Sequence, residues 1–200
     1  ATNSGLLLMP LMLGLLSASM LAGQITTRTG HYRVFPIVGT AIAATAMLLL
    51  SRMDSGTAQA QVTAYMVLLG MGLGLSMQTL VLAVQNVVPV TELGVATSSV
   101  SFFRSMGGSI GVALFGALLN AELVRRVGST FAGGEGAGVS QEMLDALPAA
   151  ERAAYVDGFA GALTTVFGYA VPLLVVAFAI VWLLQQVKLR DRPDRADAAT

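Results

Sequence analysis

Five long apolar segments constrain this chain more than any other feature of its sequence. Four of them contain no charged residue at all, and the segments lie near residues 5–23, 34–51, 62–84, 95–119 and 159–185. A helix needs about 20 such residues to cross a hydrocarbon layer about 30 Å thick. The sequence therefore predicts an all-α membrane protein with five transmembrane helices.

The composition agrees with a membrane protein and excludes several functions. The chain is 55% hydrophobic and 11% charged, whereas a soluble domain is roughly 25% charged. Its net charge is zero, so it lacks the basic surface that nucleic-acid binding requires. It has no cysteine, and His31 is its single histidine, which leaves too few ligands and nucleophiles for common metal sites and catalytic triads. We predict no metal, no cofactor and no enzymatic activity.

The connections between the first four segments are short, so successive helices are expected to be antiparallel. Residues 120–158 form a long connection, in which apolar residues at helical spacing predict a short amphipathic helix at the outer membrane surface. Residues 186–200 are polar and charged, and they predict a cytoplasmic tail without regular structure. The five predicted transmembrane helices would then form one bundle, with this loop on one side of the membrane and this tail on the other.

Basic residues near the span ends indicate the orientation of the chain. With a cytoplasmic tail, six basic residues lie inside and four outside, which the positive-inside rule favours modestly. The chain start then lies outside the cell. Because the sequence begins ATNSG, without an initiator methionine or a basic signal-peptide region, we expect a fragment whose further N-terminal helices belong to the same protein.

Arg104 is the one charged residue inside the predicted spans. A cation near the bilayer centre costs roughly 2.5 to 3.5 kcal/mol on insertion scales, so such a residue indicates a functional or pairing site. Two roles are open for Arg104. It is either structural, pairing with helix-end carbonyls, with a glutamine such as Gln78 or with a carboxylate elsewhere in the protein, or it takes part in substrate binding or coupling. At helical spacing it lies beside small residues that we expect to pack against another helix, with a hinge as the alternative: Gly107, Gly108 and Gly111.

The segment 62–84 carries a second face of small and polar residues. Gly70 and Gly74 lie four residues apart, a spacing that lets two helix backbones approach closely, and Gln78 continues the same face. Gln78 is expected either to form a hydrogen bond between helices or to line a cavity. Gln85 and Asn86 follow at the cytoplasmic helix end, as capping or interface residues or as further candidates for substrate contact or coupling.

Two stretches resemble the major facilitator superfamily (MFS). Residues 23–33, GQITTRTGHYR, resemble the second copy of the signature loop of that superfamily, although Thr27 stands where the signature often has an aspartate. The stretch LAVQNVVPVTELGVATSSVSFFRSMGGSIGVALFGALLN resembles the penultimate-helix region of the fourteen-span drug:proton antiporter branch. The resemblance implies a signature loop made by Gly23, Arg28, Gly30 and Arg33.

The resemblance also implies a function. The five helices would form part of the C-terminal bundle of a proton-coupled transporter in the cytoplasmic (inner) membrane, which exports drugs or other amphipathic molecules by alternating access. Its partners would be the lipid bilayer, a small-molecule substrate and protons. The segment 62–84 would line the cavity, flanked by 5–23 and 95–119. Since none of the five predicted spans contains Asp or Glu, the proton-carrying carboxylate is expected outside this chain.

Two other functions compete with transport. A membrane-embedded enzyme would need a nucleophile paired with a base, and the absence of cysteine, of a usable histidine and of any acid in the spans leaves no such pair visible. A non-transporting structural or sensory polytopic membrane protein is the stronger alternative. An upstream soluble signalling domain would favour that alternative, whereas further spans with embedded carboxylates would favour transport.

Overall fold

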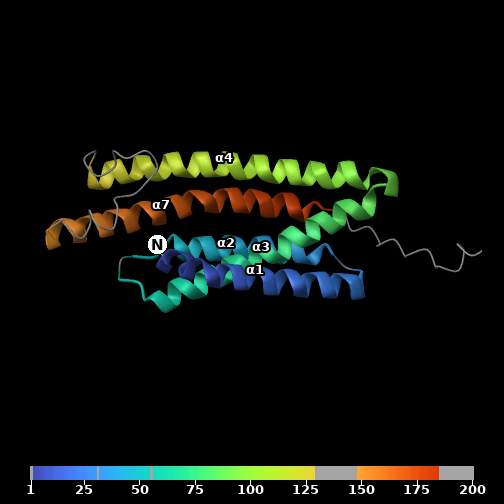
Figure 1. Cartoon of the computed structure of the whole chain (residues 1–200), viewed down its shortest axis with the longest axis horizontal. Coiled ribbons are helices and arrows are strands. Elements are labelled where there is room, and N and C mark those ends of the chain that lie inside the picture. Colours follow the sequence, from blue (N-terminus) through green and yellow to red (C-terminus); the bar gives the residue numbers. More distant parts are fainter. Residues whose placement is uncertain (1, 31, 55, 129–147, 185–200) are drawn as a thin grey trace, which may run out of the picture.

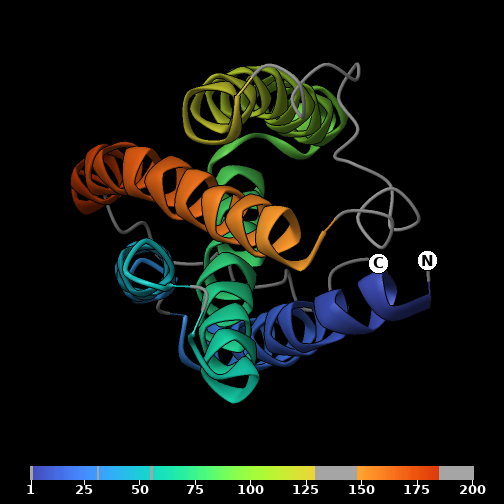
Figure 2. The ribbon, with the colours of Figure 1, turned by 90° about the vertical axis from the view of Figure 1, so that its left-hand side faces the viewer.

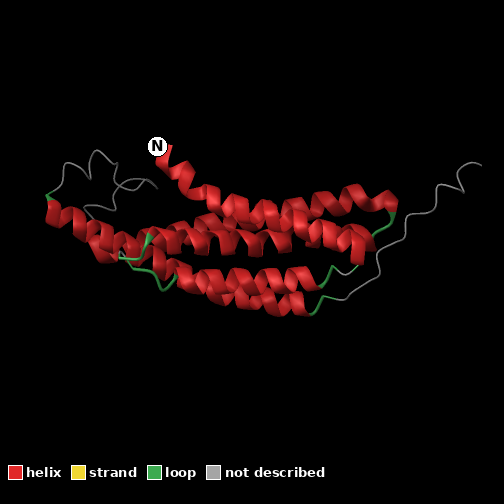
Figure 3. Cartoon of the chain, turned by 90° about the horizontal axis from the view of Figure 1, so that it is seen from below, coloured by secondary structure: helices red, strands yellow, loops and turns green. Residues whose placement is uncertain are grey.

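The structure is a computed structural model that describes residues 2–30, 32–54, 56–128 and 148–184. These residues form helices joined by short loops, with no strand among them (Figure 3). The predicted all-α fold is confirmed. The predicted tail at residues 186–200 lies outside the described residues.

The described residues contain five α-helices and one short 3₁₀ helix, and successive α-helices among them run antiparallel (Figure 1). Four of the α-helices are long and apolar enough to cross a membrane, whereas α2 has 17 residues. That length is at the lower end of the roughly 17 to 25 residues that span a bilayer. The elements in chain order are α1 (Thr2–Thr29), α2 (Val34–Leu50), α3 (Gln59–Val87), η1 (Val90–Glu92), α4 (Leu93–Val127) and α7 (Ala149–Trp182).

Glycines bring α3 unusually close to two neighbouring helices. Gly70 faces α1, where an added Cβ would collide with the carbonyl oxygen of Leu11. Gly72 lies on another face, where an added Cβ would be 2.6 Å from both the Ala43 nitrogen and the Gly39 carbonyl oxygen of α2. Small residues at such contacts allow backbones to approach and gain van der Waals packing. The three helices α1, α2 and α3 therefore form the tightly packed part of the bundle.

The buried apolar core lies in this same part. Ala43, Ala46 and Leu50 on α2 pack with Leu69 on α3, and all four are at most 9% exposed. Phe167 of α7 covers the cluster from another side. The core thus joins α7 to the three-helix unit.

Helix α4 is the least covered of the five. It lies beside α7, on the side of the bundle away from α1 (Figure 2). Its buried residues, Glu122 and Leu123, are both near its C-terminal end. Further toward its start, Phe103 and Val112 are 64% and 77% exposed. Most of the α4 surface is consequently open in this chain.

The connection predicted at 120–158 is shorter than the sequence indicated. α4 continues to Val127 and α7 begins at Ala149, so the segment expected as part of a surface helix instead includes the first turns of α7. Helices of 35 and 34 residues are about 50 Å long, well beyond a hydrocarbon layer of about 30 Å. Their ends remain helical because they pack together, burying Leu123 and Tyr155. Residues 129–147 of the predicted loop lie outside the described part of the chain.

Candidate functional site

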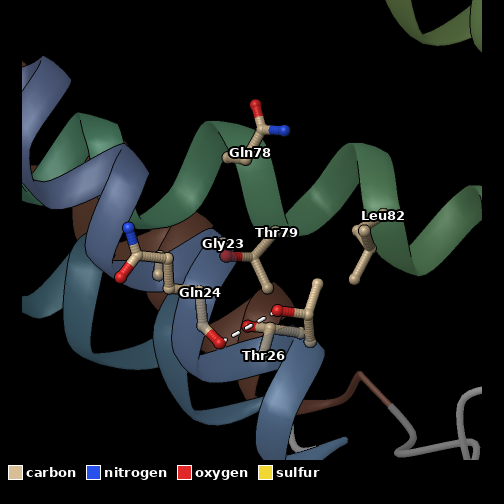
Figure 4. A pocket seen from close by; sticks show the side chains of 8 residues that line it. Gly23, Gln24, Thr26, Gln78, Thr79 and Leu82 are labelled. Carbon is tan, nitrogen blue, oxygen red and sulfur yellow. Dashed lines mark hydrogen bonds between the residues drawn. The ribbon is translucent and has the colours of Figure 1, made fainter.

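A pocket of about 310 Å³ opens between the C-terminal part of α1 and the second half of α3. In Figure 4, Thr79 and Leu82 reach from α3 toward α1, whereas the amide of the exposed Gln78 points away from α1. No lining residue is ionisable; the lining consists of Ala22, Gly23, Gln24, Thr26, Thr27, Gln78, Thr79 and Leu82. The pocket therefore offers hydroxyl and amide groups without a charge.

Thr26 is the most unusual residue of this lining. It is 1% exposed, and its side-chain oxygen has no hydrogen-bond partner among the described residues. A buried hydroxyl left unpaired costs about 1 to 3 kcal/mol, so native proteins leave few of them. Sequence reasoning missed Thr26, because a threonine in an apolar helix normally donates to its own backbone.

The predicted polar residues at the end of α3 lie at its junction with α4. The Gln85 side-chain nitrogen donates a hydrogen bond to the Thr97 hydroxyl at 3.2 Å, which links α3 to α4. Asn86 is half-buried beside it. Neither residue lines the pocket, whereas Gln78 does. The structure thus separates Gln78 from the two residues that sequence reasoning grouped with it.

Arg104 has no partner in the part of the chain that the structure describes. Its side chain is exposed on α4, and it forms no hydrogen bond or ion pair with Gln78 or with another described residue. Three nearby glycines also lack a neighbouring helix among the described residues, since a Cβ added to any of them would meet nothing within 4 Å: Gly107, Gly108 and Gly111. Gln78, one of the partners considered from the sequence, thus forms no hydrogen bond with Arg104 among the described residues, and a partner elsewhere in the protein stays a prediction.

The signature-like residues lie around the turn between α1 and α2. Gly30 has φ of 72°, and its N–H donates to the Thr26 carbonyl oxygen at 2.9 Å, which ends α1. A left-handed glycine is the usual residue at such a helix end. Arg33 donates from Nη2 to the Trp182 carbonyl oxygen at 2.8 Å, a favourable place for a cation because the last helical carbonyls lack partners. Arg28 is exposed in the last turn of α1, and Gly23 forms part of the pocket wall.

A buried carboxylate lies in α4, outside the five predicted spans, none of which contains Asp or Glu. Glu122 is 9% exposed, and its Oε2 accepts a hydrogen bond from Arg125 at 2.8 Å and lies 3.5 Å from Arg126 Nε. The fourth predicted span ends at residue 119, three residues before Glu122. Spacings of three and four residues between opposite charges were the available signal for a longer helix.

The described residues contain no cluster of three or more His, Cys, Asp or Glu side chains that could hold a metal ion. Long apolar helices packed through glycine, with an uncharged polar pocket between two of them, define a multi-pass helical membrane protein. Comparison with known proteins narrows this class.

The chain is homologous to part of an MFS-type transporter. It is 46% identical to an uncharacterized MFS-type transporter of Mycobacterium tuberculosis over 98% of its length, but spans only 29% of that relative. It is 30% identical to multidrug resistance protein 3 of Bacillus subtilis over 92% of the chain and 38% of the relative. With multidrug transporter protein MdtP of the same organism it shares 38% identity over 60% of the chain and 22% of the relative. No protein-family model matches the chain.

These similarities agree with the resemblance found in the sequence at the level of the superfamily. The relatives are transporters rather than enzymes. The first of them covers 98% of the chain, while the chain covers 29% of that relative.

Proposed function

We propose that this chain is the C-terminal part of a proton-coupled secondary transporter of the fourteen-span drug antiporter branch, placed in the cytoplasmic membrane. Its substrates would be drugs or other amphipathic small molecules, exported by alternating access. The observation that carries the proposal is similarity along nearly the whole chain to MFS-type transporters, with multidrug proteins among the relatives. The uncharged pocket on α1 and α3 supports it, because Gln78 there can contact a substrate.

The proton carrier is proposed to lie outside this chain. Glu122 is the buried carboxylate of the described helices, but two arginines hold it. Counted from Leu93, it is about 43 Å along α4 at 1.5 Å per residue, beyond a hydrocarbon layer of about 30 Å. A carboxylate that exchanges protons during transport needs a place within the membrane, which the remaining helices of the protein would supply.

Export by the full-length protein tests this function directly. Cells that express it are expected to accumulate less ethidium than control cells, and a protonophore should abolish the difference. Arg104 is proposed to pair with a group outside this chain, and losing a hydrogen bond to a charged group costs about 1.5 to 3 kcal/mol. Arg104→Ala should therefore lower the initial efflux rate by roughly tenfold. The readout is ethidium fluorescence at matched expression.

The control for Arg104→Ala is Arg52→Ala, which removes an exposed arginine outside the long helices and should leave efflux unchanged. Equal accumulation with and without the protein would favour the non-transporting alternative. Efflux that persists with the protonophore would contradict proton coupling but leave the proposed export standing.

The open face of α4 is proposed to pack against helices outside this chain. In the full-length protein, Gly111→Leu should then lower the yield of folded protein several-fold, although nothing in this chain lies within 4 Å of an added Cβ there. The control is Ala113→Leu, two residues on and about 200° around the helix. Size-exclusion chromatography measures the folded fraction. Equal yields for both variants would place Gly111 against lipid and contradict this packing.

A further inference from the structure

The helical path of the chain is interrupted between α3 and α4 at Pro89. A proline disfavours the helical conformation of the residue before it, and Val88 is accordingly extended, with φ of −85° and ψ of 151°. The single turn of η1 follows, in which the Glu92 N–H donates to the Pro89 carbonyl oxygen at 2.9 Å. None of the three η1 residues is buried. Little packing therefore opposes a change in the length of this connection.

A hydrogen bond between side chains bridges this interruption. The Gln85 Nε2 on α3 donates to the Thr97 Oγ1 on α4 at 3.2 Å, and both side chains are half-buried. Thr63 shows the usual alternative, since its hydroxyl donates to the Gln59 carbonyl oxygen one turn earlier in its own helix. The Thr97 oxygen instead accepts from the neighbouring helix. This bond therefore holds the first turns of α4 to α3 and stabilises neither helix by itself.

The two ends of α4 are held in different ways. The buried residues of α4 lie near its C-terminal end, where Arg126 donates to the Thr165 hydroxyl of α7 at 3.1 Å. At the N-terminal end, Val95 is 70% exposed, and a Cβ added to Gly94 would meet nothing within 4 Å. A helix that is fixed at one end can turn about that end once a bond at the other end breaks.

We propose that the hydrogen bond between Gln85 and Thr97 is a catch that holds the N-terminal end of α4 against α3, and that α4 turns about its C-terminal end on α7 when the catch opens. Extension of η1 supplies the length that this movement needs. The inference rests on the proposed function, because the movement is taken to open the cytoplasmic side of the transporter to its substrate. One neutral hydrogen bond shifts such an equilibrium by only about fivefold, so the two arrangements can interchange during transport.

Distances between pairs of spin labels on the purified full-length protein test the proposal. This chain has no cysteine, so labelled cysteines can be introduced once any cysteine elsewhere in the protein is replaced by serine. Val34→Cys and Val95→Cys label exposed positions near the starts of α2 and α4. Thr97→Val removes the acceptor and keeps the shape of the side chain, so it should raise the ratio of the longer to the shorter distance by roughly fivefold. A second pair, Val124→Cys and Val156→Cys near the end of α4 and the start of α7, should keep its distance.

A second variant and a matched control accompany this measurement. Gln85→Met removes the donor at similar side-chain length and should give the same shift, and combining it with Thr97→Val should add nothing because both changes break one bond. Thr63→Val is the control, since Thr63 is also a half-buried helical threonine but bonds within α3. It should leave both distances unchanged. An unchanged first distance in Thr97→Val and Gln85→Met, the same shift in Thr63→Val, or an equal shift of the second pair would overturn the catch.

Ethidium binding distinguishes failure of the catch from failure of the proposed transport. If ethidium enters from the cytoplasmic side, the open arrangement is the one that binds it, and a larger open population lowers the apparent Kd. Thr97→Val should therefore bind ethidium up to about fivefold more tightly than the parent, which a mere loss of stability would not produce. Shifted distances with an unchanged Kd would overturn the role of the catch in transport. A parent that neither binds nor exports ethidium would contradict the proposed drug export, and the distances would still decide whether the catch exists.

Discussion

Gly70→Ala is expected to lower the free energy of unfolding by about 3 kcal/mol, at the upper end of the usual cost of overpacking a core. The added Cβ would overlap with the Leu11 carbonyl oxygen on α1. A backbone atom cannot rotate away as a side chain can, so α1 and α3 must move apart along their contact. Titration of the purified full-length protein with SDS, followed by circular dichroism or fluorescence, measures the change.

Gly168→Ala is the control for Gly70→Ala. Gly168 is also inside a long helix, but the nearest atom to an added Cβ is the Ser51 Cβ at 3.9 Å, an ordinary contact. Replacing glycine by alanine inside a helix gains about 1 kcal/mol in helix propensity, so this variant should be as stable as the parent or more so. A loss of equal size in both variants would show that the cost is not the approach of α1.

The sequence predicted the helices well because long uncharged apolar runs leave a chain few alternatives. It also placed Gly70 and Gly74 on one face from their spacing, and the structure puts the backbone of α1 against that face. The same spacing could not name α1 as the neighbour, nor indicate that Gly72 approaches Gly39 on α2. Periodicity defines a face of a helix, whereas the partner depends on how all the helices assemble.

Hydropathy was less informative at the helix ends. It placed the end of the fourth span at residue 119, but α4 continues to Val127. Glu122, Arg125 and Arg126 are too polar for a membrane window, yet they stabilise a helix by pairing at three and four residues. Contact with α7 adds to that stabilisation. A helix end that extends beyond the apolar span is stabilised by charge pairs and tertiary contacts, so apolar content alone does not predict it.

The candidate site was predictable only in part. Helical spacing singled out Gln78, but the pocket exists because this part of α3 lies beside α1. The other lining residues, 22–24, 26 and 27, come from α1. The unpaired hydroxyl of Thr26 depends on a side-chain arrangement that composition and spacing do not encode. For Arg104 the cost of a charge in a membrane identified the residue, while none of the described residues pairs with it.

Arg126→Ala is expected to release the end of α4 from α7 and to lower the free energy of unfolding by about 2 kcal/mol, the range of hydrogen bonds to charged groups. Arg126 donates from Nη2 to the Thr165 hydroxyl at 3.1 Å, and its Nε lies 3.5 Å from Glu122. Its guanidinium also lies against Gly161, where an added Cβ would be 2.6 Å from Nη1. Few other contacts hold α4, because its buried residues all lie near this end.

Arg125→Ala separates the role of the ion pair from the role of the contact with α7. Arg125 also pairs with Glu122, at 2.8 Å, but its side chain is 70% exposed, and exposed pairs contribute about 0 to 1 kcal/mol. SDS titration should therefore show a small loss for Arg125→Ala and a larger one for Arg126→Ala. Hydrogen exchange should accelerate in the last turns of α4 and the first turns of α7 for Arg126→Ala alone. Equal losses in both variants would mean that Glu122 needs only a counter-charge, and that Arg126 does not join the two helices.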